Sequence, residues 1–220
     1  MGMDGVRALV FDVFGTVVDW RSGVIRDVSV LAAEHGADID AASLADRWRA
    51  AYRPAMNQVR TGELPWTNLD GLDEAGRAWL TTCWHRLDPW PDAVAGLQRL
   101  KERHIIAAFS NGNVALLVNM AKWGGLPWDF VFSAELFRHY KPDPQTYLGA
   151  AELLGLVPAE VMLVAAHNDD LIAADGLGLA TAFVPRPGDL GPNHQANREP
   201  ARPYTRVAAD FGDLADQLGA

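Results

Sequence analysis

Short apolar runs alternate with amphipathic stretches along most of this chain. The run 6–11 ends abruptly at Asp12, and further short apolar runs occupy 105–109, 130–132, 161–165 and 181–184. Apolar residues at helical spacing separate the later runs, and a terminal helix is expected over 211–218 after an edge strand at 207–209. Strands that alternate with helices are typical of a parallel sheet with helices on both faces. The pattern therefore predicts an α/β fold with a doubly wound parallel sheet.

A long helical insertion separates the first predicted strand from the others. Apolar residues recur at helical spacing over 24–32, 44–55 and 72–84, and the stretch between about 21 and 90 contains no convincing strand. Six of the eight tryptophans fall in or beside this region, and core packing is the simpler interpretation of those rings. We interpret 19–90 as a helical cap domain, inserted into a core domain made of 1–18 and 91–220, with a ligand site between the two.

Composition and charge narrow the classes of partner. The 220 residues are 49% hydrophobic and carry a formal net charge of −9, which weighs against nucleic acid or an anionic membrane as a partner. No apolar run reaches the ~18 residues of a membrane helix, and no signal-peptide pattern opens the chain. The single cysteine, Cys83, is expected to be a buried structural thiol and suits a reducing, cytoplasmic location. The apolar stripes of the inserted helices could pack against a second copy of the chain, so a homodimer is possible.

Polar clusters follow the predicted strands, and these clusters carry the candidate chemistry. They are Asp12 with Thr16, Ser110 with Asn111, Lys141, and the segment 167–170. The carboxyl ends of parallel strands meet at one edge of a sheet, which is where ligands bind in open α/β folds. Burying an unpaired carboxylate at this edge is costly, so Asp12 needs a functional reason. We interpret Asp12 as a nucleophile that the other clusters serve.

The same clusters resemble the four motifs of the haloacid dehalogenase superfamily, in order and over essentially the whole chain. The matching segments are Asp12-x-Phe14-Gly15-Thr16, Ser110-Asn111-Gly112, Lys141-Pro142-Asp143 and Asp169-Asp170. The resemblance implies a Rossmann-like core with a helical cap inserted after the first strand, and it implies that Asp12 is the nucleophile.

One position distinguishes the subfamilies. Phosphatases of the superfamily carry a second aspartate two residues after the nucleophile, where it acts as general acid and helps to hold magnesium. This chain has Phe14 there, and a phenyl ring cannot donate a proton. The chain instead resembles the type II 2-haloacid dehalogenases, which carry an aromatic residue at this position. The pair Trp48-Arg49 and the spacing of Tyr147 from Lys141 also resemble that subfamily. That resemblance implies hydrolysis of short 2-haloalkanoates to 2-hydroxyalkanoates through an aspartyl ester, with no metal and no cofactor.

The resemblance also suggests a role for each site residue. Lys141 is the cation expected to keep Asp12 ionised, and Thr16 is expected to orient it. Ser110 and Asn111, with backbone amides at the start of the following helix, are expected to hold the carboxylate of a small anionic substrate.

The leaving halide and the hydrolytic water need further groups. Arg49 is expected to bind the halide, while Phe14 and Tyr147 complete the expected substrate-binding set. The fourth motif departs from the dehalogenase pattern, because alanines and His167 replace its serines and asparagine. Either His167 or Asp170 then activates water, since an imidazole titrates near neutrality and suits a general base.

Two other interpretations stay open. The first is a magnesium-dependent phosphatase, with the metal held by Asp12 and the pair Asp169-Asp170, since magnesium prefers oxygen ligands. The second is a binding module that kept the fold without its chemistry. The retention of Asp12, Lys141 and Asp170 together weighs against the second.

Overall fold

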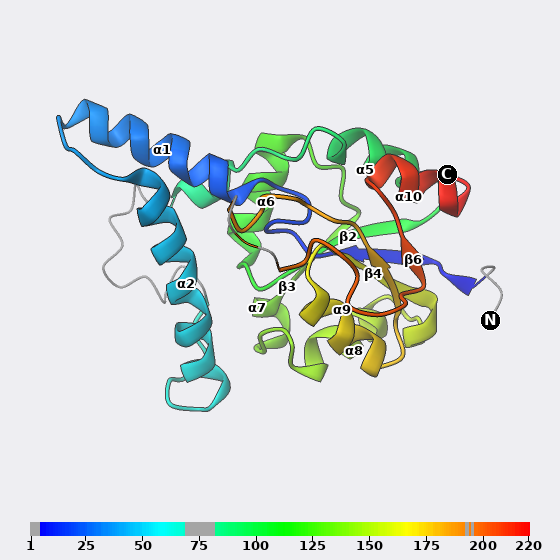
Figure 1. The fold of residues 1–220 in the computed structure, drawn as a ribbon. Helices are drawn as coiled ribbons and strands as arrows, with labels where there is room; N and C mark the ends of the chain where they lie inside the picture. Colours follow the sequence, from blue (N-terminus) through cyan, green and yellow to red (C-terminus); the bar gives the residue numbers. More distant parts are fainter. Residues whose placement is uncertain (1–4, 69–81, 192–193, 195) are drawn as a thin grey trace.

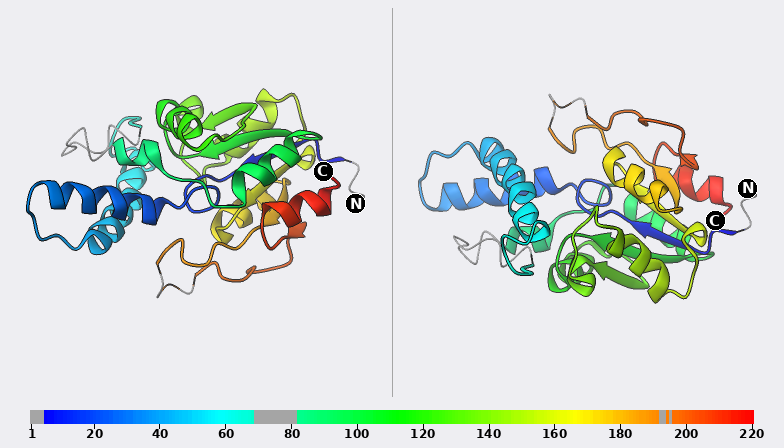
Figure 2. Two further views of the ribbon diagram at one scale, coloured as in Figure 1. Left: turned by 90° about the horizontal axis from the view of Figure 1, so that it is seen from above. Right: turned by 90° about the horizontal axis from the view of Figure 1, so that it is seen from below.

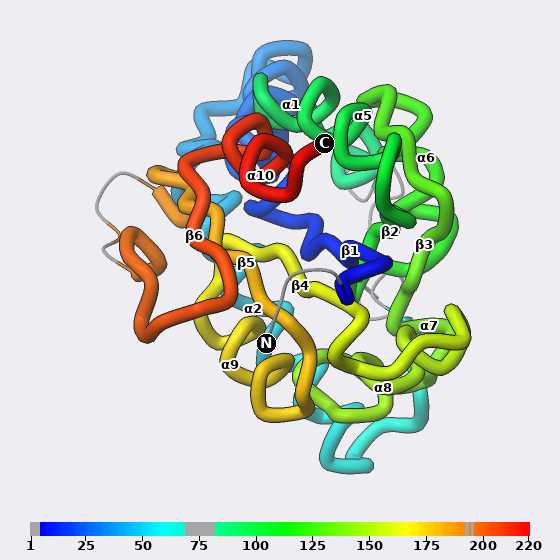
Figure 3. Tube along the Cα trace, turned by 90° about the vertical axis from the view of Figure 1, so that its right-hand side faces the viewer, coloured from blue at the N-terminus to red at the C-terminus, as the bar shows by residue number. Residues whose placement is uncertain are grey.

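A six-stranded parallel sheet forms the centre of the described part of the molecule (Figure 1). This computed structural model describes residues 5–68, 82–191, 194 and 196–220. The strands are β1 (Ala8–Phe11), β2 (Ile105–Ser110), β3 (Phe130–Ser133), β4 (Val161–Ala165), β5 (Ala180–Phe183) and β6 (Arg206–Val207). Their spatial order is β3-β2-β1-β4-β5-β6, and Figure 3 shows β1 between β2 and β4. Asp12, which follows β1, therefore lies near the middle of the sheet edge formed by the carboxyl ends of the strands.

Helices cover both faces of this sheet (Figure 2). One face packs against α5 (Ala93–Lys101), α6 (Val114–Gly124) and α10 (Phe211–Leu218); the other packs against α8 (Pro144–Leu153) and α9 (Asn168–Gly176). Successive residues of β1 point to opposite faces, so Leu9 and Phe11 join the first core while Ala8 and Val10 join the second. The short elements α7 (Ala134–Phe137) and η3 (Pro158–Glu160) complete the second side. The expected doubly wound α/β fold is confirmed.

The inserted helices lie beyond the carboxyl edge of the sheet (Figure 1). They are α1 (Trp20–Glu34), α2 (Ala41–Arg60) and the 3₁₀ helix η2 (Thr82–Arg86). Asp19 and Asp40 are the N-caps of α1 and α2, because each carboxylate accepts a hydrogen bond from a backbone N–H of the first turn. The helices thus face the end of the sheet at which the polar clusters were expected.

Several element boundaries differ from those expected. The first strand begins at Ala8 rather than at residue 6, because its paired register with β2 and β4 begins at Ala8. The edge strand is Arg206–Val207 rather than 207–209, since it pairs only with the last two residues of β5. The expected helical stripe 72–84 lies mostly outside the described residues, and its described end belongs to the 3₁₀ helix η2.

Two further expectations concern Cys83 and the membrane. The Cys83 thiol is buried and free, as expected, and burial raises its pKa to about 12. None of the helices in the described residues has both the length and the apolar character needed to span a bilayer.

Candidate active site

The polar clusters meet around Asp12 at the end of β1. The Asp12 backbone N–H donates to the Val164 carbonyl, so the sheet fixes this residue between two strands. Lys141 Nζ lies 2.8 Å from Asp12 Oδ1 and 2.6 Å from Asp170 Oδ2, and it also donates to the Phe109 carbonyl. The side chains of Asp12, Lys141 and Asp170 are each 9–10% exposed. Segments far apart in the sequence thus form one buried network of charges.

Both oxygens of the Asp12 carboxylate have partners. Oδ1 faces Lys141, while Oδ2 accepts a hydrogen bond from Thr16 Oγ1 at 2.7 Å and lies 2.9 Å from His167 Nδ1. The Thr16 hydroxyl itself accepts from the Ala166 backbone N–H, which leaves its proton to point at Asp12. Burial would raise the pKa of Asp12, but the charges and hydrogen bonds of Lys141 and His167 outweigh it and hold that pKa well below its usual range. Asp12 is therefore an ionised, oriented carboxylate.

Asp170 and Tyr147 lie behind Lys141. The Tyr147 hydroxyl donates to Asp170 Oδ1 at 2.6 Å, and Lys141 occupies the other Asp170 oxygen. Burial lowers the pKa of Lys141, yet the carboxylates of Asp12 and Asp170 raise it above its ordinary value. Tyr147 is fully buried, and its hydroxyl holds Asp170. The substrate-binding role expected for Tyr147 stays a prediction.

Ser110 and Asn111 also differ from expectation in their partners. Asn111 Oδ1 accepts from the Lys141 backbone N–H at 2.7 Å, and its amide nitrogen donates to the Lys141 carbonyl. The buried Ser110 hydroxyl accepts from the Gly112 N–H, which closes the turn after β2. Both amide ends of Asn111 are thus engaged with the backbone of Lys141. The described contacts give Asn111 a part in positioning Lys141, and its substrate-binding role stays a prediction.

His167 precedes α9 and turns its ring toward Asp12. It occupies the N-cap position of that helix, but its side chain makes no capping hydrogen bond. Nδ1 faces Asp12 Oδ2, and Nε2 lies 2.8 Å from Oδ2 of Asp189. Burial alone would lower the pKa of His167, but hydrogen bonds and charges from the two carboxylates raise it to about 10. With Asp12 ionised, the ring is an imidazolium held at both nitrogens.

Asp189 is the site residue that sequence reasoning missed. It lies in the stretch 185–203, which its proline, glycine and polar content marks only as a loop. Its carboxylate is nevertheless buried, with a side chain 5% exposed. Twenty-two residues separate it from His167, so no spacing links the two in the sequence. Only the path of the folded loop brings this carboxylate to the ring.

Arg49 reaches the site from α2. Its guanidinium carbon lies 5.9 Å from the centroid of the Phe14 ring and 5.5 Å from that of Trp20. Burial lowers the pKa of Arg49, while the nearby charges of Asp12 and Asp189 oppose this shift. An arginine stays protonated at any ordinary pH, so α2 places one positive charge close to Asp12.

An aromatic wall surrounds this arginine. Trp84 stacks on Trp20 and contacts Phe14, Trp48 and Tyr52 edge-on. The indole N–H groups of Trp20 and Trp84 are buried and have no hydrogen-bond partner among the described residues. Across that same part of the chain, no group of three or more His, Cys, Asp or Glu side chains is arranged to hold a metal ion. The site therefore combines an ionised carboxylate, three cationic side chains and an apolar wall.

Comparison with known proteins assigns the chain to a family. The model of the haloacid dehalogenase-like hydrolases matches residues 6–178. An (S)-2-haloacid dehalogenase 4A from Burkholderia cepacia is 32% identical over 209 residues, which cover 85% of this chain and 86% of that protein.

Solved structures agree in sequence and in fold. The crystal structure of the L-2-haloacid dehalogenase PA0810 is 48% identical with a TM-score of 0.94, covering 98% of this chain and 99% of that one. The defluorinating L-2-haloacid dehalogenase Rha0230 is 46% identical with a TM-score of 0.93, covering 98% of this chain and 96% of that one. With its central parallel sheet, its inserted helices and a buried carboxylate at the end of β1, the chain belongs to the haloacid dehalogenase-like hydrolases.

Proposed function

We propose that the protein is a metal-independent 2-haloacid dehalogenase that converts short 2-haloalkanoates into 2-hydroxyalkanoates. The observation that carries this proposal is Asp12, ionised and oriented beside Lys141, with Phe14 where a general acid would stand in a phosphatase. A departing halide needs no proton, so a site without that acid is suited to carbon–halogen cleavage. The relatives named as 2-haloacid dehalogenases support the same chemistry.

In the first step, an oxygen of Asp12 attacks the carbon that bears the halogen. A carbon–oxygen bond forms, and the carbon–halogen bond breaks with its electron pair leaving on the halide. This covalent route divides a difficult displacement into two easier steps. Arg49 supplies positive charge for the substrate carboxylate or the departing halide, and the ring of Phe14 forms an apolar wall beside it.

In the second step, water attacks the carbonyl carbon of the Asp12 ester. Esterification removes the negative charge of Asp12, so the imidazolium of His167 loses one stabilising partner and releases a proton to solvent. The neutral ring then takes a proton from the attacking water and gives it to the departing alkoxide, which leaves as the 2-hydroxy acid. The ring finally recovers the proton of the new Asp12 carboxylic acid, so one turnover releases one halide and one proton.

His167 is better placed than Asp170 for this role. Both oxygens of Asp170 are engaged, one with Lys141 and one with Tyr147. His167 Nδ1 instead lies against the very carboxylate that becomes the ester. We therefore assign water activation to His167 and the positioning of Lys141 to Asp170.

The surrounding assignments complete the proposal. Residues 19–90 form the cap that carries Arg49, and 1–18 with 91–220 form the core that carries the nucleophile. The single cysteine, free and buried, suits a reducing cytoplasmic location. A homodimer stays a prediction that light scattering of the purified protein would test.

Halide release in chelator-treated buffer tests the function. We expect the wild-type protein to release chloride from chloroacetate or 2-chloropropionate without added metal. Asp12→Asn replaces the nucleophile by a neutral amide, so it should abolish release. Phosphate esters offered with and without magnesium are the counter-test. Phosphate release that requires magnesium, with no halide release, would overturn the proposal in favour of the phosphatase interpretation.

A further inference from the structure

We propose that Asp189 is a positioning residue for His167, delivered by the loop after β5, and that it fixes the ring nitrogen that meets the hydrolytic water. This inference rests on the proposed function and extends it to a residue outside the four motifs. The contact that motivates it is the 2.8 Å distance between His167 Nε2 and Asp189 Oδ2, made by a carboxylate that is almost wholly buried.

The contact determines which nitrogen of His167 can act as a base. An ionised carboxylate only accepts hydrogen bonds, so Nε2 must carry a hydrogen while it faces Asp189. When the ring is neutral, its lone pair is then on Nδ1, the atom that lies 2.9 Å from Asp12. A ring held at both nitrogens also cannot rotate away. Asp189 thereby selects the tautomer and the orientation that the second step requires.

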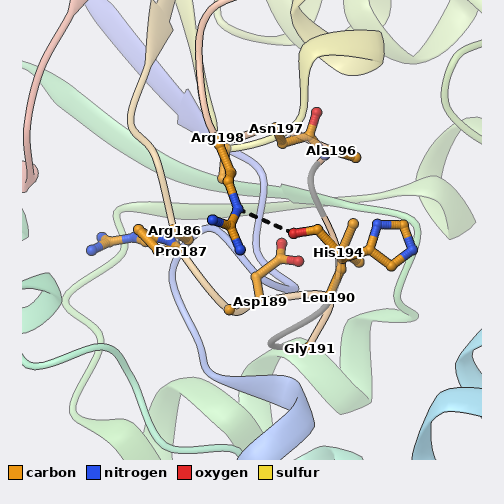
Figure 4. A pocket seen from close by; sticks show the side chains of 11 residues that line it. Arg186, Pro187, Asp189, Leu190, Gly191, His194, Ala196, Asn197 and Arg198 are labelled. Carbon is orange, nitrogen blue, oxygen red and sulfur yellow. Dashed lines mark hydrogen bonds between the residues drawn. The ribbon is translucent and has the colours of Figure 1, made fainter.

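The loop that carries Asp189 is anchored to the turn that follows Asp12. The Asp189 N–H donates to the Arg186 carbonyl, and the Arg186 guanidinium donates to the Thr16 carbonyl at 2.9 Å. Two further guanidinium nitrogens bind both carboxylate oxygens of Asp92. Figure 4 shows Asp189 among the loop side chains, with Arg198 donating to the carbonyl of His194. Asp189 is thus fixed relative to Thr16 and, through it, to the nucleophile.

Gly15 leaves the space that this carboxylate needs. Its φ of +89° is a conformation that favours glycine. A Cβ at this position would lie 2.3 Å from Asp189 Oδ2 and 3.1 Å from His167 Cε1. The glycine of the first motif therefore accommodates the pair formed by His167 and Asp189, in addition to its role in the turn after Asp12.

The reaction needs Asp189 most when Asp12 is esterified. In the free enzyme, Asp12 and Asp189 share the charge of the imidazolium. Once Asp12 is an ester, Asp189 is the one of these two carboxylates that still carries charge. It then stabilises the imidazolium that forms as water loses its proton. Removing its charge should therefore slow ester hydrolysis while leaving halide displacement by Asp12 nearly intact.

Asp189→Asn, which keeps the shape and removes the charge, separates the two steps. In rapid-quench experiments with 2-chloropropionate, we expect a burst of about one chloride per site at close to the wild-type rate. Steady turnover should fall roughly 10²-fold or more, as for loss of general-base assistance. Intact-protein mass spectrometry should show the Asp12 adduct accumulating. The matched control is Glu199→Gln, an exposed carboxylate farther along the same loop, which should behave like wild type.

Several results would overturn the inference. Unchanged turnover of Asp189→Asn, or a loss of burst and turnover by the same factor with no adduct, would contradict a positioning role. A double variant that also carries His167→Gln should be no slower than His167→Gln alone, and a further additive loss would equally contradict it. Absence of halide release by wild-type protein would instead refute the proposed function itself.

A measurement on the wild-type protein guards against a variant that does not fold. With ¹⁵N-labelled histidine, the His167 signal is identified by its loss in His167→Gln. It should show a protonated Nε2 with a strongly hydrogen-bonded proton when the Asp12 ester is trapped. A trapped ester whose His167 proton resides on Nδ1 would refute the proposed orientation.

Discussion

At the scale of single residues, charge balance explains why the site holds together. Asp12, Asp170 and Asp189 form one buried network of ion pairs with Lys141 and His167, and each charge in it faces at least one of opposite sign. Burying any one of them alone would cost several kcal/mol. The network therefore tolerates the ionised nucleophile because Lys141 and His167 compensate it. The same coupling makes the stability of the protein depend on pH.

His167 gives this dependence a definite sign. Its pKa is about 10 in the folded protein, against an ordinary value of about 6.5. A raised folded-state pKa means that its stabilising contribution is fully present below about pH 6.5 and is lost as pH rises toward about 10. We expect the free energy of unfolding of the wild type to fall across this window more steeply than that of His167→Gln. Urea denaturation at a series of pH values measures both slopes.

The control for this prediction is His35→Gln. His35 is exposed, so its replacement should leave the wild-type slope unchanged. Parallel stability curves for wild type and His167→Gln between pH 6.5 and 10 would show that the ring is not held as an imidazolium.

At the scale of elements, the ends of strands and the starts of helices position the side chains of the site. Asp12 follows the last residue of β1, His167 comes shortly after β4, and Asp170 lies in the first turn of α9. The helix α2 sends the charged side chain of Arg49 toward Phe14. The position of Arg49 therefore depends on the packing of α2 across the carboxyl edge of the sheet. We expect the affinity for substrate to depend on this arginine.

Arg49→Lys tests this delivery. A lysine keeps the charge but loses the planar guanidinium that stacks on Phe14 and Trp20 and offers paired donors. We expect KM for 2-chloropropionate to rise about 10-fold or more, the equivalent of ~1–3 kcal/mol for a lost charged hydrogen bond. Steady-state kinetics measure the change. The control Arg47→Lys lies on an exposed position of the same helix and should leave KM as it is; an unchanged KM for Arg49→Lys would argue against substrate contact.

At the scale of the whole molecule, polar contacts join the inserted helices to the sheet domain. Arg53 pairs with Asp169, and Arg60 binds Asp143 at 2.7–2.8 Å. The Tyr140 hydroxyl also donates to the Thr67 carbonyl at 2.6 Å. Asp143 follows Lys141 by two residues, so the second of these ion pairs ties α2 directly to the loop that carries Lys141. We therefore expect the position of α2 and the order of this loop to be coupled.

Arg60→Gln should loosen this coupling. Its partner Asp143 is only 19% exposed, so the pair is partly shielded from water and worth on the order of 1 kcal/mol. We expect KM to rise several-fold and hydrogen exchange to increase in α2, while exchange in the sheet stays the same. Kinetics and hydrogen-exchange mass spectrometry provide the two readouts.

Arg53→Gln is the matched control, because Arg53 and Asp169 are 81% and 61% exposed and such a pair contributes little. Equal effects of the two variants, or no effect of Arg60→Gln, would mean that the ion pair does not hold the cap in place.

The fold class and the central part of the site could be predicted from the sequence alone. Apolar runs of strand length can be read locally, and polar clusters follow four of them, so Asp12, Lys141 and Asp170 were expected at one sheet edge and do meet there. The four motifs carried that information because each is contiguous in the chain.

The atoms that each side chain contacts could not be predicted from the sequence and follow from the folded path of the chain. It turned Asn111 toward the Lys141 backbone, Tyr147 toward Asp170, and His167 away from its helix and onto Asp12. It also brought Asp189 from a loop without periodicity to the far side of the imidazole. Hydrogen-bond partners depend on the path of the chain in three dimensions, whereas hydrophobic periodicity records only which side of an element is buried.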